Sequence, residues 1–318
     1  MTTPPPYWLP LRLSATAQIL QLSWLFTQQH RFTEPFFDDS IAVCKRLFAE
    51  NKATNKPLTG IEVLLQPTPI PAAKTSVIVH HVSRCGSTLI AQLMALNEQM
   101  IVLSEVPVLD DVLQLLPEQK KPVYFNAALQ WLSQCRIGTE QQVLVKADAW
   151  QLFQHEHIKK SCPDAAYVLL YRHPYEVWQS HQKSRGMHMV PGMLPANALP
   201  APAHDLSPGD LDGYCAHVLE HYFRSMYQLA VDHPQYLLLN YVQGPMALTL
   251  QTAQHAGIAL SETLLAQMQT RSQFHAKRPG EAFAEKMNHQ SIPESLATAM
   301  AYYHQLEALR LQQSIARK

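Results

Sequence analysis

The sequence predicts a three-layer α/β/α fold with a central parallel sheet, preceded by an N-terminal helical extension. Short apolar runs, which are typical of buried parallel strands, occur at 75–83, 100–103, 143–146, 166–171 and 236–241. Segments with helical periodicity occur at 88–97, 109–116, 125–135, 149–161, 174–184, 211–231 and 293–316. Strands that alternate with helices predict βαβ units, and such sheets bind ligands at the carboxyl ends of their strands.

The first 72 residues differ in character from the rest of the chain. Residues 1–13 are proline-rich and are expected to be extended, whereas periodic segments at 14–29 and 37–50 predict helices. We therefore expect a helical extension over residues 1–72 and one α/β domain over residues 73–318.

The composition limits the classes of function. The 25 Lys and Arg residues balance the 25 Asp and Glu residues, which argues against the basic surface of a nucleic-acid-binding protein. The five cysteines are odd in number and lack short-range pairing, so we expect reduced thiols and a cytoplasmic location. Neither a signal peptide nor an apolar run long enough to span a membrane is recognisable. We expect no membrane partner, and the sequence leaves a homodimer open.

A loop of small residues, SRCGST at 83–88, joins the first predicted strand to the next helix. This is the architecture of a phosphate-binding loop (P-loop), in which backbone amides and the positive end of the helix dipole face an anion. Gly86 permits a close approach of the backbone. Ser87 and Thr88 add hydroxyl donors, and Arg84 adds a positive charge. The alternative is an ordinary strand–helix turn without a ligand.

Two other phosphate chemistries fit this loop poorly. A nucleoside triphosphatase loop needs a second glycine and a lysine before the Ser or Thr, and both are missing here. A cysteine phosphatase would use Cys85 as nucleophile and an arginine about six residues later, but position 91 is alanine. The histidines at 80 and 81 end a strand with no third ligand at suitable spacing, so we expect buried histidines and no metal.

A second motif, AYVLLYRHPYEVWQS at 166–180, places Arg172 at the end of a predicted strand and Ser180 eight residues later. This resembles the 3′-phosphate motif of the sulfotransferases that use 3′-phosphoadenosine 5′-phosphosulfate (PAPS), in a bacterial-type, P-loop form of that fold. The 83–88 loop is similar to the 5′-phosphosulfate loop of the same family, with Ser83 for the usual Pro and Cys85 for the usual Ser. The resemblance implies that the donor is bound by residues 84–88, that is Arg84, Cys85, Gly86, Ser87 and Thr88, and by Arg172 and Ser180.

Two later segments extend the resemblance more weakly. YLLLNYVQG at 236–244 looks like the family strand that carries an aromatic residue near the adenine, which points to Tyr241. AKRPGEAF at 276–283 is similar to a basic segment that also holds the 3′-phosphate, and it implies a role for Arg278 and for Lys277. A solvated basic turn is the alternative for that segment.

The catalytic residues implied are Glu105, Lys146 and Arg84. The small-molecule sulfotransferases have a K-T-H segment whose His is the base, but this chain has Asp148 in its place, after Lys146. The protein-tyrosine sulfotransferases use a Glu about twenty residues after the basic residue of the loop, and Glu105 follows Arg84 at 105 − 84 = 21. We therefore expect Glu105 to be the general base and Lys146 to lie near the transferred sulfate. The alternatives are that Asp148 is the base or orients Lys146, that Glu105 is a helix N-cap or a surface carboxylate, and that Lys146 is an exposed residue at the end of a strand.

The resulting hypothesis is transfer of a sulfuryl group from PAPS, without a metal, to a hydroxyl or amine. The acceptor, a small molecule or a peptide, is not specified by the sequence. The Met- and Pro-rich stretch 186–210 either lines an acceptor pocket or packs as an ordinary loop. The alternative functions are a non-catalytic nucleotide-binding module of the same fold and, less favoured, a P-loop kinase or triphosphatase.

Overall fold

The computed structural model describes residues 4–16, 19–52, 56–195, 197–199, 207, 209–274 and 291–316. Its centre is a five-stranded parallel sheet in the order β5-β6-β4-β7-β8. The strands are β4 Lys74–His81, β5 Met100–Ser104, β6 Gln142–Lys146, β7 Ala166–Tyr171 and β8 Leu237–Asn240. Each of the five predicted apolar runs forms a strand of this sheet, so the predicted parallel sheet is confirmed.

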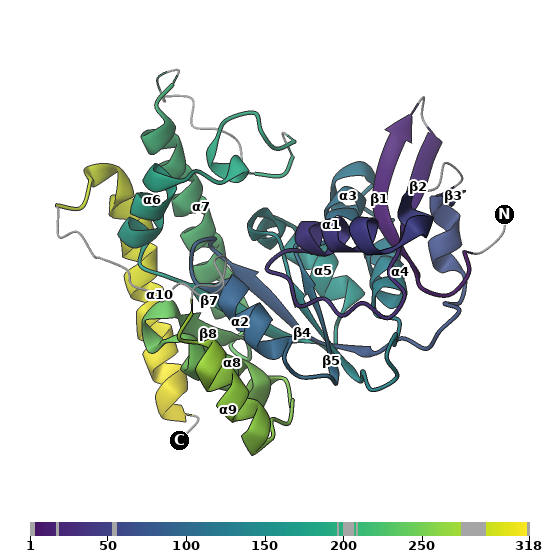
Figure 1. Cartoon of the computed structure of the whole chain (residues 1–318). Helices are drawn as coiled ribbons and strands as arrows, with labels where there is room; N and C mark the ends of the chain where they lie inside the picture. Colours follow the sequence, from purple (N-terminus) through teal and green to yellow (C-terminus); the bar gives the residue numbers. More distant parts are fainter. Residues whose placement is uncertain are drawn as a thin grey trace.

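Helices flank this sheet, which confirms the layered α/β architecture (Figure 1). The α-helices are α1 Phe37–Leu47, α2 Ser87–Met94, α3 Pro107–Leu115, α4 Lys121–Leu132, α5 His155–Ser161, α6 Pro174–Lys183, α7 Leu211–Asp232, α8 Pro245–His255, α9 Glu262–Arg271 and α10 Ala297–Ala316. Short 3-10 helices are η1 Ala49–Lys52, η2 Ile61–Leu65, η3 Ala149–Gln154, η4 Met187–Met189, η5 Tyr241–Gln243 and η6 Glu294–Leu296. None of the helices described is long and apolar enough to cross a membrane.

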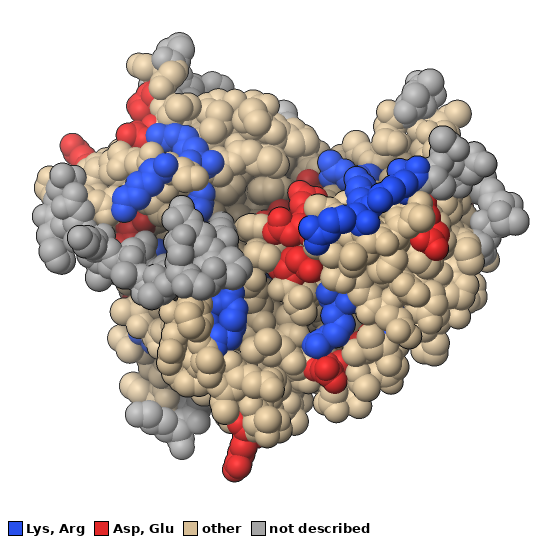
Figure 2. Space-filling model, viewed as in Figure 1, with Lys and Arg blue, Asp and Glu red and all other residues tan. Residues whose placement is uncertain are grey.

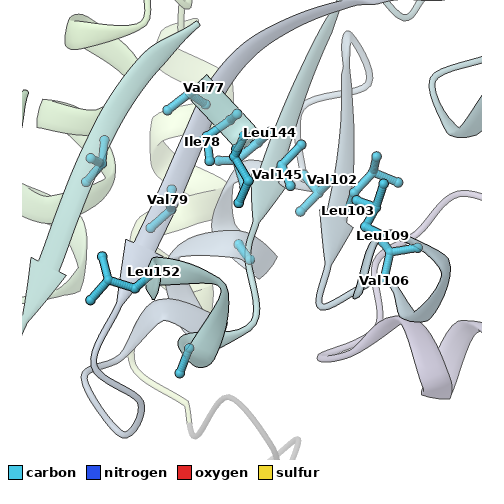
Figure 3. Packing of buried hydrophobic residues seen from close by; sticks show 14 of the residues in the cluster. Val77, Ile78, Val79, Val102, Leu103, Val106, Leu109, Leu144, Val145 and Leu152 are labelled. Atoms are coloured by element: carbon cyan, nitrogen blue, oxygen red, sulfur yellow. The ribbon is translucent and has the colours of Figure 1, made fainter. Parts of the chain in front are cut away.

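The central strands are buried because apolar side chains cover both of their faces. Val77, Ile78, Val145 and Leu103 are each at most 2% exposed, and Figure 3 shows them packed between neighbouring strands and helices. Parallel strands covered on both faces have continuous apolar runs rather than alternating ones. This is why the sequence pattern located them.

The N-terminal extension differs from the prediction. Residues 14–29 were expected to be helical, but β1 Trp8–Thr16 and β2 Ile19–Phe26 form an antiparallel hairpin, and β3 Leu58–Gly60 adds a third strand. The helical assignment of 14–29 is therefore wrong, whereas the helix expected at 37–50 is present as α1.

The physical reason for the hairpin is an alternation of apolar residues that the helical interpretation overlooked. Leu22 and Trp24 are 0% and 1% exposed and point to one face of β2, with the partly buried Ser23 between them. The Trp24 ring packs edge-on against Trp131 of α4, with 4.9 Å between ring centroids. Burial of Trp24 against Trp131 of this helix stabilises the strand over a helix of the same residues.

The extension shares its hydrophobic core with the sheet. Buried residues from Trp8 to Leu64 belong to one cluster with those of the five-stranded sheet. A polar contact fixes β1 on α3: the backbone N of Leu13 donates to Asp111 Oδ2 at 2.9 Å, and Arg12 pairs with Asp111 Oδ1 at 3.2 Å. The hairpin therefore stands directly beside α3 and α4, as Figure 1 shows.

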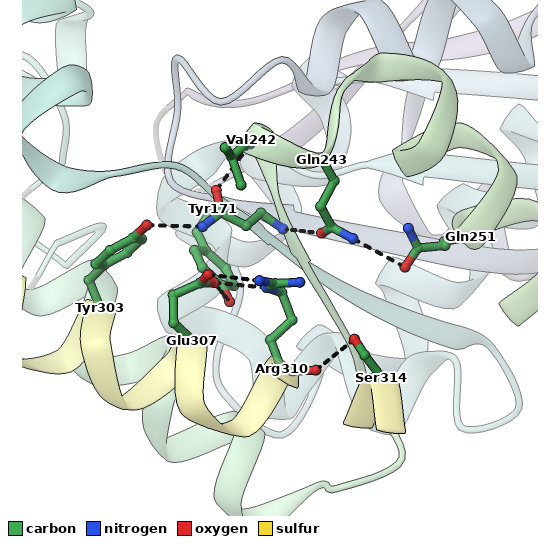
Figure 4. Close-up of polar contacts among 9 residues, drawn as sticks. Tyr171, Val242, Gln243, Gln251, Tyr303, Glu307, Arg310 and Ser314 are labelled. Atoms are coloured by element: carbon green, nitrogen blue, oxygen red, sulfur yellow. Dashed lines mark hydrogen bonds and ion pairs between the residues drawn. The ribbon is translucent and has the colours of Figure 1, made fainter. Parts of the chain in front are cut away.

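At the opposite end of the sheet, α10 is tied to the last residues of β7 and β8. Tyr171 donates to Glu307 Oε1 at 2.6 Å, and Asn240 Nδ2 donates to Tyr303 at 3.1 Å (Figure 4). Arg310 holds Glu307 in place through two hydrogen bonds of 2.9 Å. These contacts set the positions of the two strand ends.

The contact between Leu13 and Asp111 predicts how stability varies with pH. Burial raises the pKa of Asp111 to about 6, against the lowering effects of the Leu13 amide and of Arg12. The folded state therefore binds this proton more tightly than the unfolded chain does, and the unfolding free energy falls as the pH rises from about 4 to about 6. We expect Asp111→Asn, which keeps an acceptor oxygen but has no proton to lose, to flatten this dependence in urea titrations. Equal slopes in the two proteins would contradict a buried carboxyl group.

Candidate active site

The carboxyl ends of the strands form one edge of the sheet, and the predicted site residues gather there. The register pairs Ser104 with Lys146 and Lys146 with Val79, so the residues that follow β5, β6 and β4 lie side by side. Three non-glycine residues at this edge have left-handed backbones: Ser83 (φ 65°), Arg84 (φ 51°) and Glu105 (φ 56°). Such strained conformations cost free energy and cluster at functional sites.

The 83–88 loop leads into α2, whose N-terminus has no side-chain cap and lies at this edge of the sheet. Gly86 is the N-cap of α2 with φ 83°, and no side chain caps the helix. The first amides of α2 therefore lack an acceptor from a capping side chain, which is the arrangement that binds anions at helix N-termini. Ser87 and Thr88 lie in the wall of an adjoining cavity. The loop thus has the geometry of an anion site.

Cys85 contributes only its backbone to this loop. Its side chain is fully buried, and burial raises the pKa of the thiol to about 11. A buried, protonated thiol is not a nucleophile. The structure therefore argues against a cysteine phosphatase, as the sequence did.

Two of the predicted donor-binding residues, from β7 and β8, converge on the loop. A Cβ on Gly86 would lie 2.6 Å from the Tyr241 ring, so this ring packs against the loop backbone. The guanidinium of Arg172 lies over the same ring, 4.6 Å from its centroid, and donates to the backbone oxygen of Arg84 at 3.3 Å. Three strand ends are thereby joined around one small patch.

Arg172 has a neighbour that the sequence interpretation missed. Its Nε donates at 2.7 Å to Oε2 of Glu176, which lies in the first turn of α6. Ser180 lies one turn further along the same helix and is partly buried. The four-residue spacing of Arg172 and Glu176 was the available signal for this ion pair. Arg172 and Ser180 are thus placed by one strand end and the helix that follows it.

Glu105 and Lys146 form an ion pair at the centre of the site. Glu105 Oε1 lies 2.7 Å from Lys146 Nζ, and the Glu105 amide donates to the Lys146 carbonyl at 2.9 Å. Lys146 is 1% exposed and its ammonium lies 4.7 Å from the centre of the Phe36 ring. An exposed strand-end lysine was the alternative, and this burial contradicts it. Glu105 does not cap α3, whose N-cap is Val106; its side chain is 26% exposed and lines the cavity.

His81 faces the same carboxylate from the end of β4. Its Nδ1 accepts the Ser83 backbone N–H at 3.0 Å, so the proton of the neutral ring lies on Nε2. Nε2 is 3.7 Å from Glu105 Oε1. Burial, and secondarily the charge of Lys146, lower the pKa of His81 to about 3, so the ring is neutral at neutral pH. The sequence predicted a buried histidine here but gave no sign of its contact with Glu105.

Arg84 and Asp148 are held by other partners. Arg84 Nη2 donates to the backbone oxygen of Ser184, just past α6, at 2.6 Å. Burial lowers the pKa of Arg84, and the nearby Glu105 opposes this shift. Asp148 caps the N-terminus of η3 through two hydrogen bonds with Gln151. The Asp148 amide donates to Gln151 Oε1 at 3.2 Å, and Gln151 Nε2 donates to Asp148 Oδ2 at 3.3 Å. Burial raises the pKa of Asp148 well above its usual range, with Glu105 adding to the effect.

A cavity of about 770 Å³ opens in front of Glu105. Its walls come from the 83–88 loop, from α3, from residues 186–195 and from β1 and α1 of the extension. The Met-rich stretch after 186 therefore lines a pocket over the part that is described. A second cavity of about 780 Å³ opens at the amino ends of β4, β6 and β7, away from the loop. Arg278 and Lys277 lie outside the described residues.

Comparisons with known proteins give distant structural likenesses. No family model and no curated protein matches the sequence. Sulfotransferase STF9 from Mycobacterium avium is 14% identical, with 87% of this chain and 83% of that chain covered and a TM-score of 0.45. A sulfotransferase from Alicyclobacillus acidocaldarius is 13% identical, with 75% and 96% covered and a TM-score of 0.43. The sulfotransferase domain from the curacin biosynthetic pathway is 14% identical, with 76% and 98% covered and a TM-score of 0.42.

The packing of Tyr241 on Gly86 predicts an unequal effect of two glycine substitutions. Gly86 and Gly138 have similar φ angles of 83° and 87°, but a Cβ at Gly138 would meet nothing within 4 Å. Gly138→Ala should cost only the left-handed backbone, about 1–2 kcal/mol. Gly86→Ala should lower the Tm further, because the Tyr241 ring must also move. When Tyr241→Ala is added to Gly86→Ala, the double variant should recover part of that extra loss. Equal Tm values for Gly86→Ala and Gly138→Ala would show that the ring does not restrict the loop.

Proposed function

We propose that this protein is a sulfotransferase that moves a sulfuryl group from PAPS to an acceptor hydroxyl or amine. The observation that carries the proposal is the convergence of three features at one sheet edge: the uncapped 83–88 loop, the Glu105–Lys146 ion pair and Arg172. The sequence motifs around Arg84 and Arg172 support PAPS as the donor over other phosphate esters.

The residues present fit the chemistry of that donor. The amides at the start of α2 and the hydroxyls of Ser87 and Thr88 suit the 5′-phosphosulfate. Arg172 and Ser180 suit the 3′-phosphate, which would compete with Glu176 for the Arg172 guanidinium. The Tyr241 ring contacts both Gly86 and Arg172, the residues that we assign to the two phosphate groups.

Glu105 is suited to accept the proton of the acceptor. Lys146 Nζ and His81 Nε2 both face Oε1, which fixes the orientation of the carboxylate. The backbone strain at Glu105 adds to this fixed placement. In the transfer, the bond between sulfur and the phosphate oxygen breaks and a bond between sulfur and the acceptor oxygen or nitrogen forms. Glu105 takes the acceptor proton, and Arg84 with the loop amides neutralises the charge left on the phosphate.

A nucleotide-binding module without catalysis is the second candidate. Arg84 donates a hydrogen bond to the backbone oxygen of Ser184, and the Arg172 guanidinium is paired with Glu176. The first contact occupies an N–H of Arg84, and the second offsets the positive charge of Arg172. Donor binding and turnover must therefore be measured separately.

The first test is a calorimetric titration with 3′-phosphoadenosine 5′-phosphate (PAP). We expect the wild type to bind PAP and to discriminate against 5′-AMP, which lacks the 3′-phosphate. Arg172→Ala should weaken PAP binding by about tenfold or more, because hydrogen bonds to charged groups are lost. Arg224→Ala is the matched control, because it breaks an Arg–Glu pair of the same four-residue spacing on the exposed side of α7, and it should bind PAP as the wild type does. No PAP binding by the wild type would contradict the proposal at its base.

The second test is turnover of labelled PAPS with a panel of phenols, alcohols and amines. Glu105→Gln should lower the rate by about 10² to 10⁴, the range typical of a general base, and should keep PAP affinity. Glu98→Gln, which removes an exposed carboxylate paired with Arg31, is the control. Full activity of Glu105→Gln would assign the base elsewhere. PAP binding without turnover in the wild type would favour the non-catalytic module.

A further inference from the structure

The cavity in front of Glu105 is where an acceptor must enter if the proposed function is correct. Glu105 and the 83–88 loop form its inner side. Its outer side is built by α3 and by the N-terminal extension, including Phe36 and Ile41. An acceptor that reaches Glu105 must therefore contact residues that lie outside the donor loop.

The outer wall of this cavity is acidic. Five aspartates from three elements line it besides Glu105: Asp38, Asp39, Asp110, Asp111 and Asp148. Three cations are present in the lining. Arg12 is paired with Asp111, Arg84 is bonded to Ser184 on the donor side, and Lys45 belongs to α1. Figure 2 shows acidic side chains gathered in the hollow at the centre of the visible face.

The two innermost of these aspartates are held in fixed positions. Asp110 Oδ1 accepts a hydrogen bond from Trp150 Nε1 at 2.6 Å, and Asp148 Oδ2 accepts one from Gln151 Nε2 at 3.3 Å. Asp38 and Asp39 are exposed in the first turn of α1 and reach the same cavity. Carboxylates therefore follow the cavity from its interior to its mouth.

A second, independent feature indicates a polar ligand in the same cavity. His188 lines it, is 6% exposed, and its Nε2 has no hydrogen-bond partner among the described residues. Burial lowers the pKa of His188 to about 4, so the ring is neutral and has one donor and one acceptor nitrogen. Gly186 makes room for this ring, since a Cβ there would lie 2.8 Å from it. A buried polar atom without a partner is costly unless a ligand satisfies it.

We propose that the acceptor carries a positively charged amine beside the group that receives the sulfuryl unit, and that the aspartates of α1 and α3 bind this amine. The proposal rests on the proposed function, because it assumes that Glu105 faces the acceptor. It gives the N-terminal extension a role in acceptor selection, since Asp38 and Asp39 belong to it.

The unfavourable ionisation of the wall supports the same assignment. Burial raises the pKa of Asp110, and burial raises that of Asp148 with Asp110 and Glu105 adding to the effect. A cation that binds among crowded carboxyl groups stabilises their ionised form. An anionic acceptor would meet the opposite effect.

The test compares three phenols that share a ring and differ in charge: tyramine (positive), 4-ethylphenol (neutral) and 4-hydroxyphenylacetate (negative). Each is titrated by calorimetry into the protein saturated with PAP. We expect tyramine to bind most tightly and 4-hydroxyphenylacetate most weakly, with about tenfold or more between them. The double variant Asp38→Asn/Asp39→Asn should weaken tyramine about three- to tenfold and leave 4-ethylphenol unchanged.

The control variant Glu62→Gln/Asp164→Asn removes the same two charges from exposed sites outside the cavity and should leave all three affinities unchanged. Equal affinities for the three phenols, or no binding by tyramine at millimolar concentration while PAP binds, would overturn the proposal. A protein that fails to bind PAP contradicts the proposed function instead. The charge preference, measured without PAP, then decides separately whether the cavity selects amines.

Discussion

The site depends on a single buried charge. Lys146 is 1% exposed, and an ammonium group removed from water to this extent needs a counter-charge nearby. Glu105 supplies it at 2.7 Å, from a left-handed backbone position directly after the neighbouring strand. The other side of the ammonium is covered by the ring of Phe36. One ion pair thus joins the sheet edge, the carboxylate proposed as base and the N-terminal extension.

This arrangement explains why the extension is built into the domain. The hairpin shares its core with the sheet, and Asp111 binds β1 to the helix that follows Glu105. The same segment provides one wall of the cavity. A lysine buried behind the carboxylate that we propose as base also needs apolar cover, and here the cover comes from Phe36, which precedes the sheet.

The sequence predicted the parts of the structure that local patterns determine. Buried parallel strands have apolar runs, so all five strands of the sheet were located. The motifs that resemble the sulfotransferase pattern pointed to Arg172 and Tyr241, and both residues lie against the 83–88 loop. The β1–β2 hairpin was missed because the alternation at Leu22 and Trp24 was overlooked and because the residue that buries Trp24, Trp131, lies about a hundred residues away in sequence. The contacts of Phe36 with Lys146 and of His81 with Glu105 were missed for the same reason. They join residues whose separation in sequence follows neither the helix period nor the strand period.

The anchoring of α10 has a consequence for how the site is formed. Tyr171 and Asn240, which bind Glu307 and Tyr303, directly precede Arg172 and Tyr241. The positions of these two residues, which we propose to bind the donor, therefore depend on a helix that follows every other described element in the chain. During synthesis, α10 leaves the ribosome after all of these elements, so a nascent chain with a complete sheet still lacks the contacts that fix its strand ends. The donor binding that we propose is thus expected to begin only after α10 has left the ribosome.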